Sequence, residues 1–190
     1  MKKKGHIIVI SAPSGAGKTS ICKEILKSSN TIVYSISYTT RKPRDKEKNG
    51  VEYYFITENK FVDMINDEKF AEWAKVYDNY YGTPKNVLQK TIDAGKNILL
   101  EIDVQGAMDI KKVFPQACMI FIKVPNIKIL RERLIKRGQD SVSIIKKRIA
   151  NVKSELRFIN KYDYIVVNDN LEESIEAVKI IIMSLQYKVG

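Results

Sequence analysis

One stretch near the N-terminus decides the fold: His6-Ile7-Ile8-Val9-Ile10-Ser11-Ala12-Pro13-Ser14-Gly15-Ala16-Gly17-Lys18-Thr19. Its first part is a nearly continuous apolar run, which is typical of a strand buried on both faces of a parallel sheet. After the glycines, Ile21 and Ile25 repeat at helical spacing. A strand, a glycine-rich turn that ends in Gly-Lys-Thr, and a helix are together the context of a phosphate-binding loop. The stretch therefore predicts a P-loop in an α/β fold.

The residue types of this loop suit a nucleoside triphosphate. Glycine lets backbone N–H groups turn inward around phosphate oxygens, and the next helix directs its positive end at the same anion. We expect Lys18 to reach the β- and γ-phosphates of ATP and Thr19 to hold Mg²⁺. A plain Gly/Ser turn is the alternative, but it does not account for Gly17-Lys18-Thr19 between both correct flanks. Ala12 replaces the first glycine of the general pattern. The predicted ATP-binding loop comprises Ala12, Pro13, Ser14, Gly15, Ala16, Gly17, Lys18 and Thr19.

Length and composition fit one globular domain. The chain has 190 residues, of which 44% are apolar and 29% charged. No apolar run approaches the roughly 20 residues of a membrane helix, and the run after Lys2–Lys4 is too short for a signal peptide. We therefore expect a cytoplasmic protein without a membrane partner. Cys22 and Cys118 lie in apolar stretches without metal-ligand spacing, so we expect buried, reduced thiols.

The formal net charge of +11 leaves two classes open. It suits a nucleic-acid-binding protein, and it equally suits an enzyme whose substrates are polyanions. Basic residues are spread along the chain, with local gatherings at Arg41–Lys48 and Arg131–Arg137. Charge alone does not choose between the two, so the choice depends on motif spacing.

Further apolar runs predict the rest of the core. Asn97–Ile102, Cys118–Val124 and Tyr164–Val167 read as buried strands, with helical patterns between them. Such alternation predicts a layered α/β core with right-handed crossovers. Between about residues 35 and 83 tyrosines are dense, and a strand at Glu52–Ile56 and a helix at Lys60–Ile65 indicate an inserted subdomain. A basic helical hairpin from residue 126 to about residue 161 is a candidate lid, and its second helix carries an apolar stripe from Ile145 to Ile159.

A second group of motifs points to the phosphate acceptor. Arg41 and Arg44 lie three residues apart around Pro43, so both can fork onto one phosphate. They belong to the pattern Thr39-Thr40-Arg41, Pro43-Arg44, Glu47, Gly50 and Tyr53. With Phe70-Ala71-Glu72-Trp73, Asn79-Tyr80-Tyr81-Gly82-Thr83, Glu101–Gly106 and Val167-Asn168-Asp169, the chain resembles the guanylate kinase family over nearly its full length.

The resemblance implies a fold and a reaction. The fold is a three-layer P-loop NTPase core with a parallel sheet (1–34, 84–125 and 162–190), an inserted GMP-binding subdomain (35–83) and a helical lid (126–161). The reaction is transfer of the γ-phosphoryl group of ATP to GMP or dGMP, with Mg²⁺ as cofactor. The phosphate of GMP is ionised, so in-line attack needs no strong general base, and positioning and charge neutralisation do most of the catalysis.

The resemblance also implies the residues of the acceptor site. Those that bind the GMP phosphate are Arg41, Arg44, Tyr53 and Tyr81, and those that read guanine are Ser37, Glu72, Thr83 and Asp103. Glu101 joins the GMP-binding set, although many family members have Asp at position 101 and Ser at position 83. The chemistry of guanine supports this set independently, because a carboxylate suits the donors at N1 and N2 and hydroxyls suit O6. Adenine would leave a buried carboxylate unpaired.

The remaining candidates lie on the lid and near the C-terminus. Arg133 and Arg137 share one helix face, and Gly138 ends that helix. With Arg148 they resemble arginines that close over the phosphates, so the catalytic candidates are Lys18, Arg137 and Arg148. The alternative is a solvated basic helix. By resemblance Asn168 lies near the ATP ribose and adenine, and Asp103 is also a candidate to bind Mg²⁺ through water.

Three rival functions remain open. A guanylate-kinase-like module that binds phosphopeptides without chemistry is one, but such modules often lack the loop that Gly17-Lys18-Thr19 retains here. An RNA-binding protein is the second, but it leaves Glu72 and Asp103 unexplained, so no nucleic-acid partner is expected. The third is a kinase for another small phosphorylated acceptor. Oligomeric state, and the preference between GMP and dGMP, have no signal in the sequence.

Overall fold

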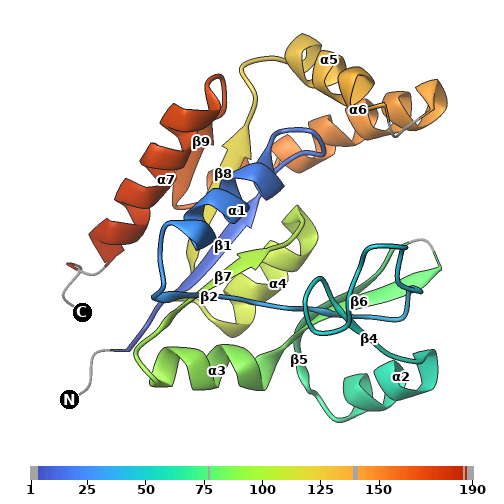
Figure 1. Cartoon of the computed structure of the whole chain (residues 1–190), viewed down its shortest axis with the longest axis vertical. Coiled ribbons are helices and arrows are strands. Elements are labelled where there is room, and N and C mark those ends of the chain that lie inside the picture. The colour runs from blue at the N-terminus through green and yellow to red at the C-terminus, as the bar shows by residue number, and fades with distance from the viewer. Residues whose placement is uncertain (1–3, 77, 139–140, 186, 188–190) are drawn as a thin grey trace.

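The computed structural model describes residues 4–76, 78–138, 141–185 and 187. Within these residues, a parallel sheet of five strands has the order β2-β7-β1-β8-β9 (Figure 1). Its strands are β1 (Ile7–Ser11), β2 (Ile32–Tyr34), β7 (Asn97–Glu101), β8 (Cys118–Lys123) and β9 (Tyr164–Val167). The expected buried strands are thus confirmed to within one or two residues, and the fold is the expected α/β class.

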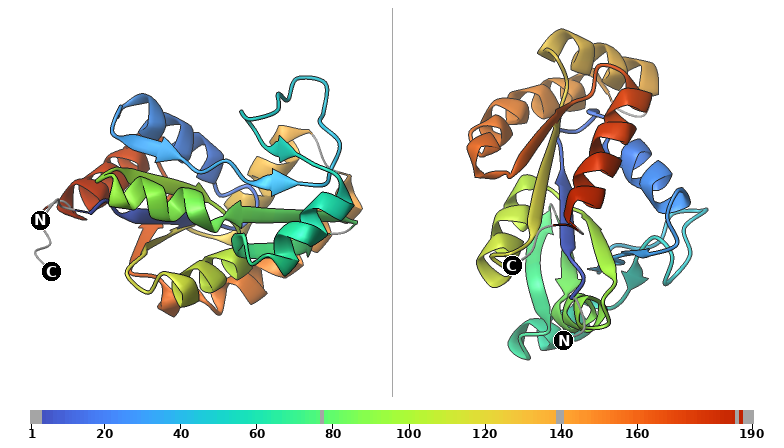
Figure 2. Two further views of the ribbon diagram at one scale, coloured as in Figure 1. Left: turned by 90° about the horizontal axis from the view of Figure 1, so that it is seen from below. Right: turned by 90° about the vertical axis from the view of Figure 1, so that its left-hand side faces the viewer.

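Helices cover both faces of this sheet, as Figure 2 shows edge-on. On one face lie α1 (Lys18–Lys27) and α7 (Leu171–Leu185), packed against Ile8 and Ile10. On the other face lie α3 (Lys85–Asp93) and α4 (Val104–Val113), packed against Ile7 and Val9. Because successive side chains of a strand point to opposite faces, a strand in the middle of three layers must be apolar throughout. This explains why Ile7–Ile10 reads as a continuous apolar run.

A second, four-stranded sheet lies beside the core in the described residues, with the order β4-β3-β6-β5 (Figure 1). Its strands are β3 (Tyr38–Thr39), β4 (Tyr54–Phe55), β5 (Phe70–Val76) and β6 (Asn79–Pro84). β3 pairs with β4 in parallel, whereas β6 is antiparallel to both β3 and β5. The helix α2 (Glu58–Asn66) is capped at its N-terminus by Thr57, whose side chain accepts a hydrogen bond from the Lys60 N–H. Phe61 of α2 is fully buried and stacks on Phe70 at a centroid distance of 4.4 Å.

Two further helices, α5 (Ile127–Arg137) and α6 (Val142–Leu156), lie beyond the carboxyl ends of the core strands (Figures 1 and 2). Asn126 and Ser141 cap their N-termini, each accepting from a backbone N–H three residues on. Gly138 ends α5 with φ 67°, as its position in the sequence predicts. Leu130 and Leu134 of α5 are fully buried with the α1 side of the core, so α5 is anchored to it.

Some expectations about individual elements were wrong. The strand expected at Glu52–Ile56 is only Tyr54–Phe55, and Ile159 lies in the 3₁₀ helix η1 (Ile159–Lys161) instead of α6. In strand β5, Trp73 is 44% exposed, whereas Phe70 is buried. Because successive side chains of a strand take opposite faces, Trp73 points away from the face that Glu72 occupies. The β5–β6 ladder also shifts register between Phe70 and Glu72.

Other expectations hold for the described residues. Cys22 and Cys118 are buried and are not joined in a disulfide, as their apolar surroundings predict. None of the described helices combines the length and the apolar character needed to cross a membrane. The proposed limits of core, subdomain and lid stay predictions.

Adjacent residues of α2 offer a test of the packing beneath the second sheet. Phe61→Ala should lower the free energy of unfolding by roughly 3–5 kcal/mol, because it leaves a cavity under two aromatic rings. Val62→Ala is the matched control, since Val62 is 37% exposed on the same helix, and it should change stability by less than about 1 kcal/mol. Urea denaturation followed by circular dichroism measures both. Equal losses in the two variants would contradict the packing described.

Candidate active site

The P-loop joins the end of β1 to the start of α1. Gly15 and Gly17 have φ of 90° and 93°, backbone conformations that residues with a Cβ rarely adopt. A Cβ on Gly17 would also lie 2.3 Å from Nδ2 of Asn168. Both conformation and space therefore require glycine at position 17. Within the loop, the Ala16 N–H donates to Pro13 O at 3.0 Å, which closes a turn. The helix α1 directs its N-terminus at the space that the loop surrounds.

Asn168 supports the P-loop by a hydrogen bond to its backbone. Its side chain is 2% exposed, and Nδ2 donates to Ala16 O at 2.7 Å. Its Oδ1 accepts from Ser174 Oγ at 3.2 Å, so α7 orients the amide. The side chain therefore braces the loop backbone, and the expected contact with the ATP ribose stays a prediction.

The polar end of the loop meets the end of β7. Lys18 Nζ donates to Ile102 O at 2.9 Å, and the Thr19 hydroxyl donates to Glu101 Oε1 at 2.5 Å. These contacts follow from the sheet, because β1 and β7 are parallel neighbours and their carboxyl ends coincide. Glu101, which we expected in the acceptor site, is thus hydrogen-bonded to Thr19, the residue expected to hold Mg²⁺.

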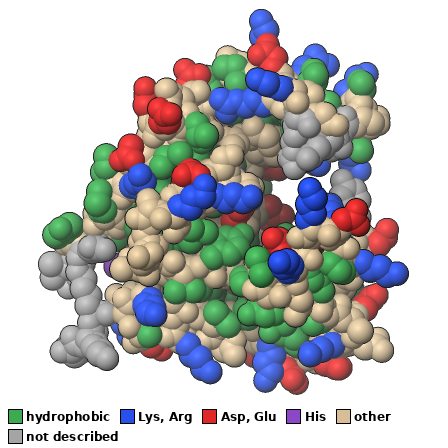
Figure 3. Space-filling view, viewed as in Figure 1, with side chains coloured by type: hydrophobic (Ala, Val, Ile, Leu, Met, Phe, Trp, Pro, Cys, Tyr) green, Lys and Arg blue, Asp and Glu red, His purple; other side chains and the backbone are tan. Residues whose placement is uncertain are grey.

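Two adjoining cavities surround these residues. The first, of about 570 Å³, is lined by Ala12, Pro13, Ser14, Gly15, Gly17, Lys18, Thr19, Ser20, Glu101, Asp103, Arg133 and Glu155. The second, of about 330 Å³, is lined by Lys18, Ser37, Tyr53, Glu72, Ala74, Val76, Tyr81, Glu101, Ile102 and Asp103. They share Lys18, Glu101 and Asp103, so groups bound in the two cavities would meet there. Figure 3 shows the molecule hollowed between the α5–α6 hairpin and the second sheet, with acidic side chains inside and basic ones around the rim.

A partly buried carboxylate, that of Glu72, lies at one wall of the second cavity. Glu72 Oε1 accepts from the Thr83 hydroxyl at 2.5 Å, and Ser37 Oγ lies 3.4 Å from Thr83 Oγ1. Burial raises the pKa of Glu72 to about 7; the Thr83 hydrogen bond opposes the shift, and the charge of Asp103 adds to it. Glycine at residue 106 leaves room for the carboxylate in this position, since a Cβ there would lie 2.9 Å from Glu72 Oε2 and the carboxylate would have to shift. The Asp103 side chain accepts from Gly106 N–H at 2.8 Å and caps α4.

The two arginines of the β3–β4 loop differ in exposure. The Arg41 guanidinium lies 5.6 Å from the ring centroid of Tyr53, and the Tyr53 and Tyr81 rings lie 5.8 Å apart. Since both tyrosines line the second cavity, the structure brings Arg41 to its edge. Arg44 is exposed, and its backbone N–H donates to Glu47 Oε2 at 2.9 Å.

Two arginines of the α5–α6 hairpin, Arg148 and Arg133, lie near the P-loop. Arg148 Nη1 donates to Ser14 Oγ, so α6 contacts the loop directly. Arg133 lines the first cavity, and its Nη2 donates to Asp169 O at 3.3 Å. Arg137 is the last residue of α5, and its side chain lies outside the described part of the structure.

Sequence reasoning missed Glu155. This residue lines the first cavity, and its buried Oε2 has no hydrogen-bond partner among the described residues. Burial raises its pKa to about 7, with Asp103 adding to the shift and Lys18 opposing it. The available signal was its place seven residues after Arg148, because residues two turns apart share a helix face.

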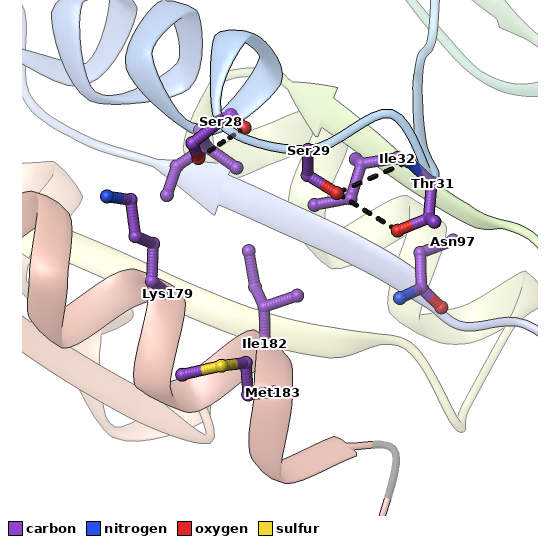
Figure 4. Close-up of a pocket in the computed structure, with 9 residues that line it drawn as sticks. Ser28, Ser29, Thr31, Ile32, Asn97, Lys179, Ile182 and Met183 are labelled. Carbon is purple, nitrogen blue, oxygen red and sulfur yellow. Dashed lines mark hydrogen bonds between the residues drawn. The ribbon is translucent and has the colours of Figure 1, made fainter.

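A further cavity, of about 270 Å³, opens at the amino ends of β2 and β7 (Figure 4). Ile25, Asn97, Lys179, Ile182 and Met183 are among its lining residues. None of the predicted site residues lines it.

The fold and the two cavities define a P-loop protein that can bind two phosphorylated ligands end to end. The guanylate kinase family model matches residues 4–185. The guanylate kinase of Caldanaerobacter subterraneus subsp. tengcongensis is 44% identical over 189 residues, covering 100% of this chain and 92% of that protein. That of Shouchella clausii is 45% identical, covering 95% and 88%. The crystal structure of guanylate kinase from Anaplasma phagocytophilum superimposes with a TM-score of 0.80 at 31% identity, covering 100% of this chain and 90% of that one. The chain belongs to the guanylate kinase family.

The partly buried carboxylate of Glu72 predicts a pH-dependent stability. The pKa of Glu72 is about 7 in the folded protein, against an ordinary value of 4.5, so the folded state keeps a proton that the unfolded state loses between these values. Stability contributed at this position is therefore lost as the pH rises from about 4.5 to 7. Glu72→Gln should raise the free energy of unfolding at pH 8 by roughly 1–3 kcal/mol and have little effect near pH 4.5. Urea denaturation across this range tests it, with Glu68→Gln as an exposed control. A destabilised Glu72→Gln variant at pH 8 would contradict it.

Proposed function

We propose that the chain transfers the γ-phosphoryl group of ATP to GMP or dGMP, giving ADP and GDP or dGDP. The observation that carries this proposal is the meeting of two cavities at Lys18, one built by a P-loop and the other lined by the partly buried carboxylate of Glu72. Membership of the guanylate kinase family supports it. The intact loop also weighs against a module that only binds phosphopeptides.

Guanine recognition centres on Glu72. Thr83 donates to Oε1, which leaves Oε2 to accept from guanine N1 and N2. Because the Thr83 hydrogen is used in this way, Ser37 is the hydroxyl that donates to O6, and Thr83 orients the carboxylate. Adenine would present an acceptor at N1 to the carboxylate and an amino group to Ser37. That mismatch costs roughly 1–3 kcal/mol for each buried group left without a partner.

The acceptor phosphate lies between Arg41, Tyr53 and Tyr81, with Arg44 reaching it from the exposed side of the loop. One of its oxygens attacks the γ-phosphorus of ATP. As the new bond forms, the bond to the bridging β–γ oxygen breaks, and ADP leaves with that electron pair. Lys18 stands between both ligands and neutralises the transferred group, and Arg148, Arg133 and Arg137 act from the hairpin.

Magnesium fits the oxygen donors beside the P-loop. Thr19 and Glu101 supply a hydroxyl and a carboxylate in contact at 2.5 Å, and hard oxygen ligands of this kind suit Mg²⁺. Thr19 would hold the ion, and Glu101 and Asp103 would bind its water molecules. The bound ion would neutralise charge on the phosphates.

In this proposal, different ranges of the chain bind different ligands. Residues 35–83 would bind GMP, residues 126–161 would close over the phosphates, and the remaining residues would bind ATP. Closure would exclude water and limit ATP hydrolysis. A cytoplasmic location stays a prediction.

A panel of acceptors tests the activity. With Mg-ATP, rapid ADP release is expected with GMP and dGMP but not with AMP, CMP or UMP. Lys18→Ala should lower the rate by roughly a thousandfold or more, since it removes the charge at the transferred group. Lys23→Ala is the matched control, an exposed lysine on the same helix, and should keep full activity. ATP binding without turnover on any acceptor would overturn the kinase proposal and favour the binding module.

A second experiment separates two roles for Glu101. If it acts on Mg²⁺ through Thr19, Glu101→Gln should raise the Mg²⁺ concentration for half-maximal rate by roughly tenfold, as losing a supporting hydrogen-bond partner does. The KM for GMP should stay nearly constant. Glu24→Gln, near the far end of α1, is the control. A raised KM for GMP with an unchanged Mg²⁺ requirement would instead assign Glu101 to the acceptor site.

A further inference from the structure

Glu47 contacts both arginines of the acceptor loop. Its Oε1 accepts from Arg41 Nη2 at 2.9 Å, and its Oε2 accepts from the Arg44 backbone N–H at 2.9 Å. Glu47 N–H in turn donates to Arg44 O at 2.9 Å, which closes a tight turn from residue 44 to residue 47. One carboxylate therefore ties the side chain of one arginine to the main chain of the other.

These contacts fix Arg41 from several sides. The Arg41 and Glu47 side chains are only 16% and 17% exposed, so this ion pair is better shielded than a surface pair. Arg41 Nη1 also donates to Lys42 O at 2.8 Å, and the guanidinium lies over the rings of Tyr53 and Phe55. Hydrogen bonds from Arg41 and from the Arg44 backbone lower the pKa of Glu47, so the carboxylate is ionised.

We propose that Glu47 is a positioning residue of the acceptor-phosphate site, which holds Arg41 and Arg44 in the arrangement that binds the phosphate. The inference rests on the proposed function, because it takes these arginines as phosphate ligands. Arginine otherwise loses side-chain freedom when it binds, and holding it in place beforehand reduces that cost.

The same contacts could instead weaken GMP binding, and this alternative makes the proposal testable. A carboxylate paired with Arg41 could compete with the phosphate for the guanidinium, and removing its charge would then tighten GMP binding. Positioning predicts weaker binding instead. Glu47→Gln separates the two, since the amide has one acceptor oxygen and cannot serve both the Arg41 side chain and the Arg44 N–H.

The experiment compares GMP with guanosine, which lacks the phosphate. Calorimetric titration of Glu47→Gln should show GMP binding about tenfold weaker than in the natural chain, with guanosine binding unchanged. In steady-state assays the KM for GMP should rise by about tenfold, while kcat and the KM for ATP change less than twofold. Glu47→Asp keeps the charge but reaches less far, so an intermediate loss is expected.

Glu52→Gln is the matched control. Glu52 lies in the same loop and its Oε2 accepts from the Lys48 N–H at 2.7 Å, but it is exposed and, within the described residues, forms no hydrogen bond or ion pair with either arginine. It should bind both ligands as the natural chain does.

Each remaining outcome has a distinct meaning. Unchanged or tighter GMP binding in Glu47→Gln overturns the positioning role and leaves the kinase proposal intact. Equal losses for GMP and guanosine, with a lower unfolding midpoint, also overturn it, because Glu47 would then support the fold of the subdomain. A natural chain that binds GMP no better than guanosine would remove the phosphate role of the arginines, and the proposed function would fail with it.

Discussion

Burial of β1 on both faces is the constraint on which the rest of the structure depends. Ile8 and Ile10 pack with α1 and α7, and Ile7 and Val9 pack with α3 and α4. This packing fixes where β1 lies in the sheet and in which direction it runs. The P-loop, which follows β1 in the chain, must therefore lie at the carboxyl end of the sheet. Since β7 runs parallel beside it, Glu101 and Asp103 reach the same place. The site is thus a consequence of where two neighbouring strands end.

The site contains several acidic residues, although the chain as a whole is strongly basic. A chain of net charge +11 places Glu72, Glu101, Asp103 and Glu155 around Lys18 in the two cavities. Burial raises the pKa of Glu72 and Glu155 to about 7. These acids stabilise the fold less than apolar residues of similar size would. Such an arrangement is expected where ligands, and not neighbouring side chains, supply the partners.

The sequence predicts the core better than the acceptor subdomain, for physical reasons. Long buried strands leave continuous apolar runs, and the P-loop is local, so both can be read directly. Strands of two residues such as β3 and β4 have no measurable periodicity, and a register shift between Phe70 and Glu72 interrupts the β5–β6 ladder. Most acceptor-site residues were named by resemblance, and Ser37, Tyr53, Glu72 and Tyr81 do line one cavity. Contacts such as Thr19 with Glu101, or Glu47 with Arg41, depend on folded geometry and have no linear signal.

The contact between Asn168 and the P-loop joins two segments 152 residues apart. The chain is synthesised from its N-terminus, so Ala16 is made 152 residues before Asn168, the residue that braces it. This hydrogen bond therefore cannot form until synthesis has passed Asn168. Until then, the loop lacks the support that the folded domain gives to its backbone.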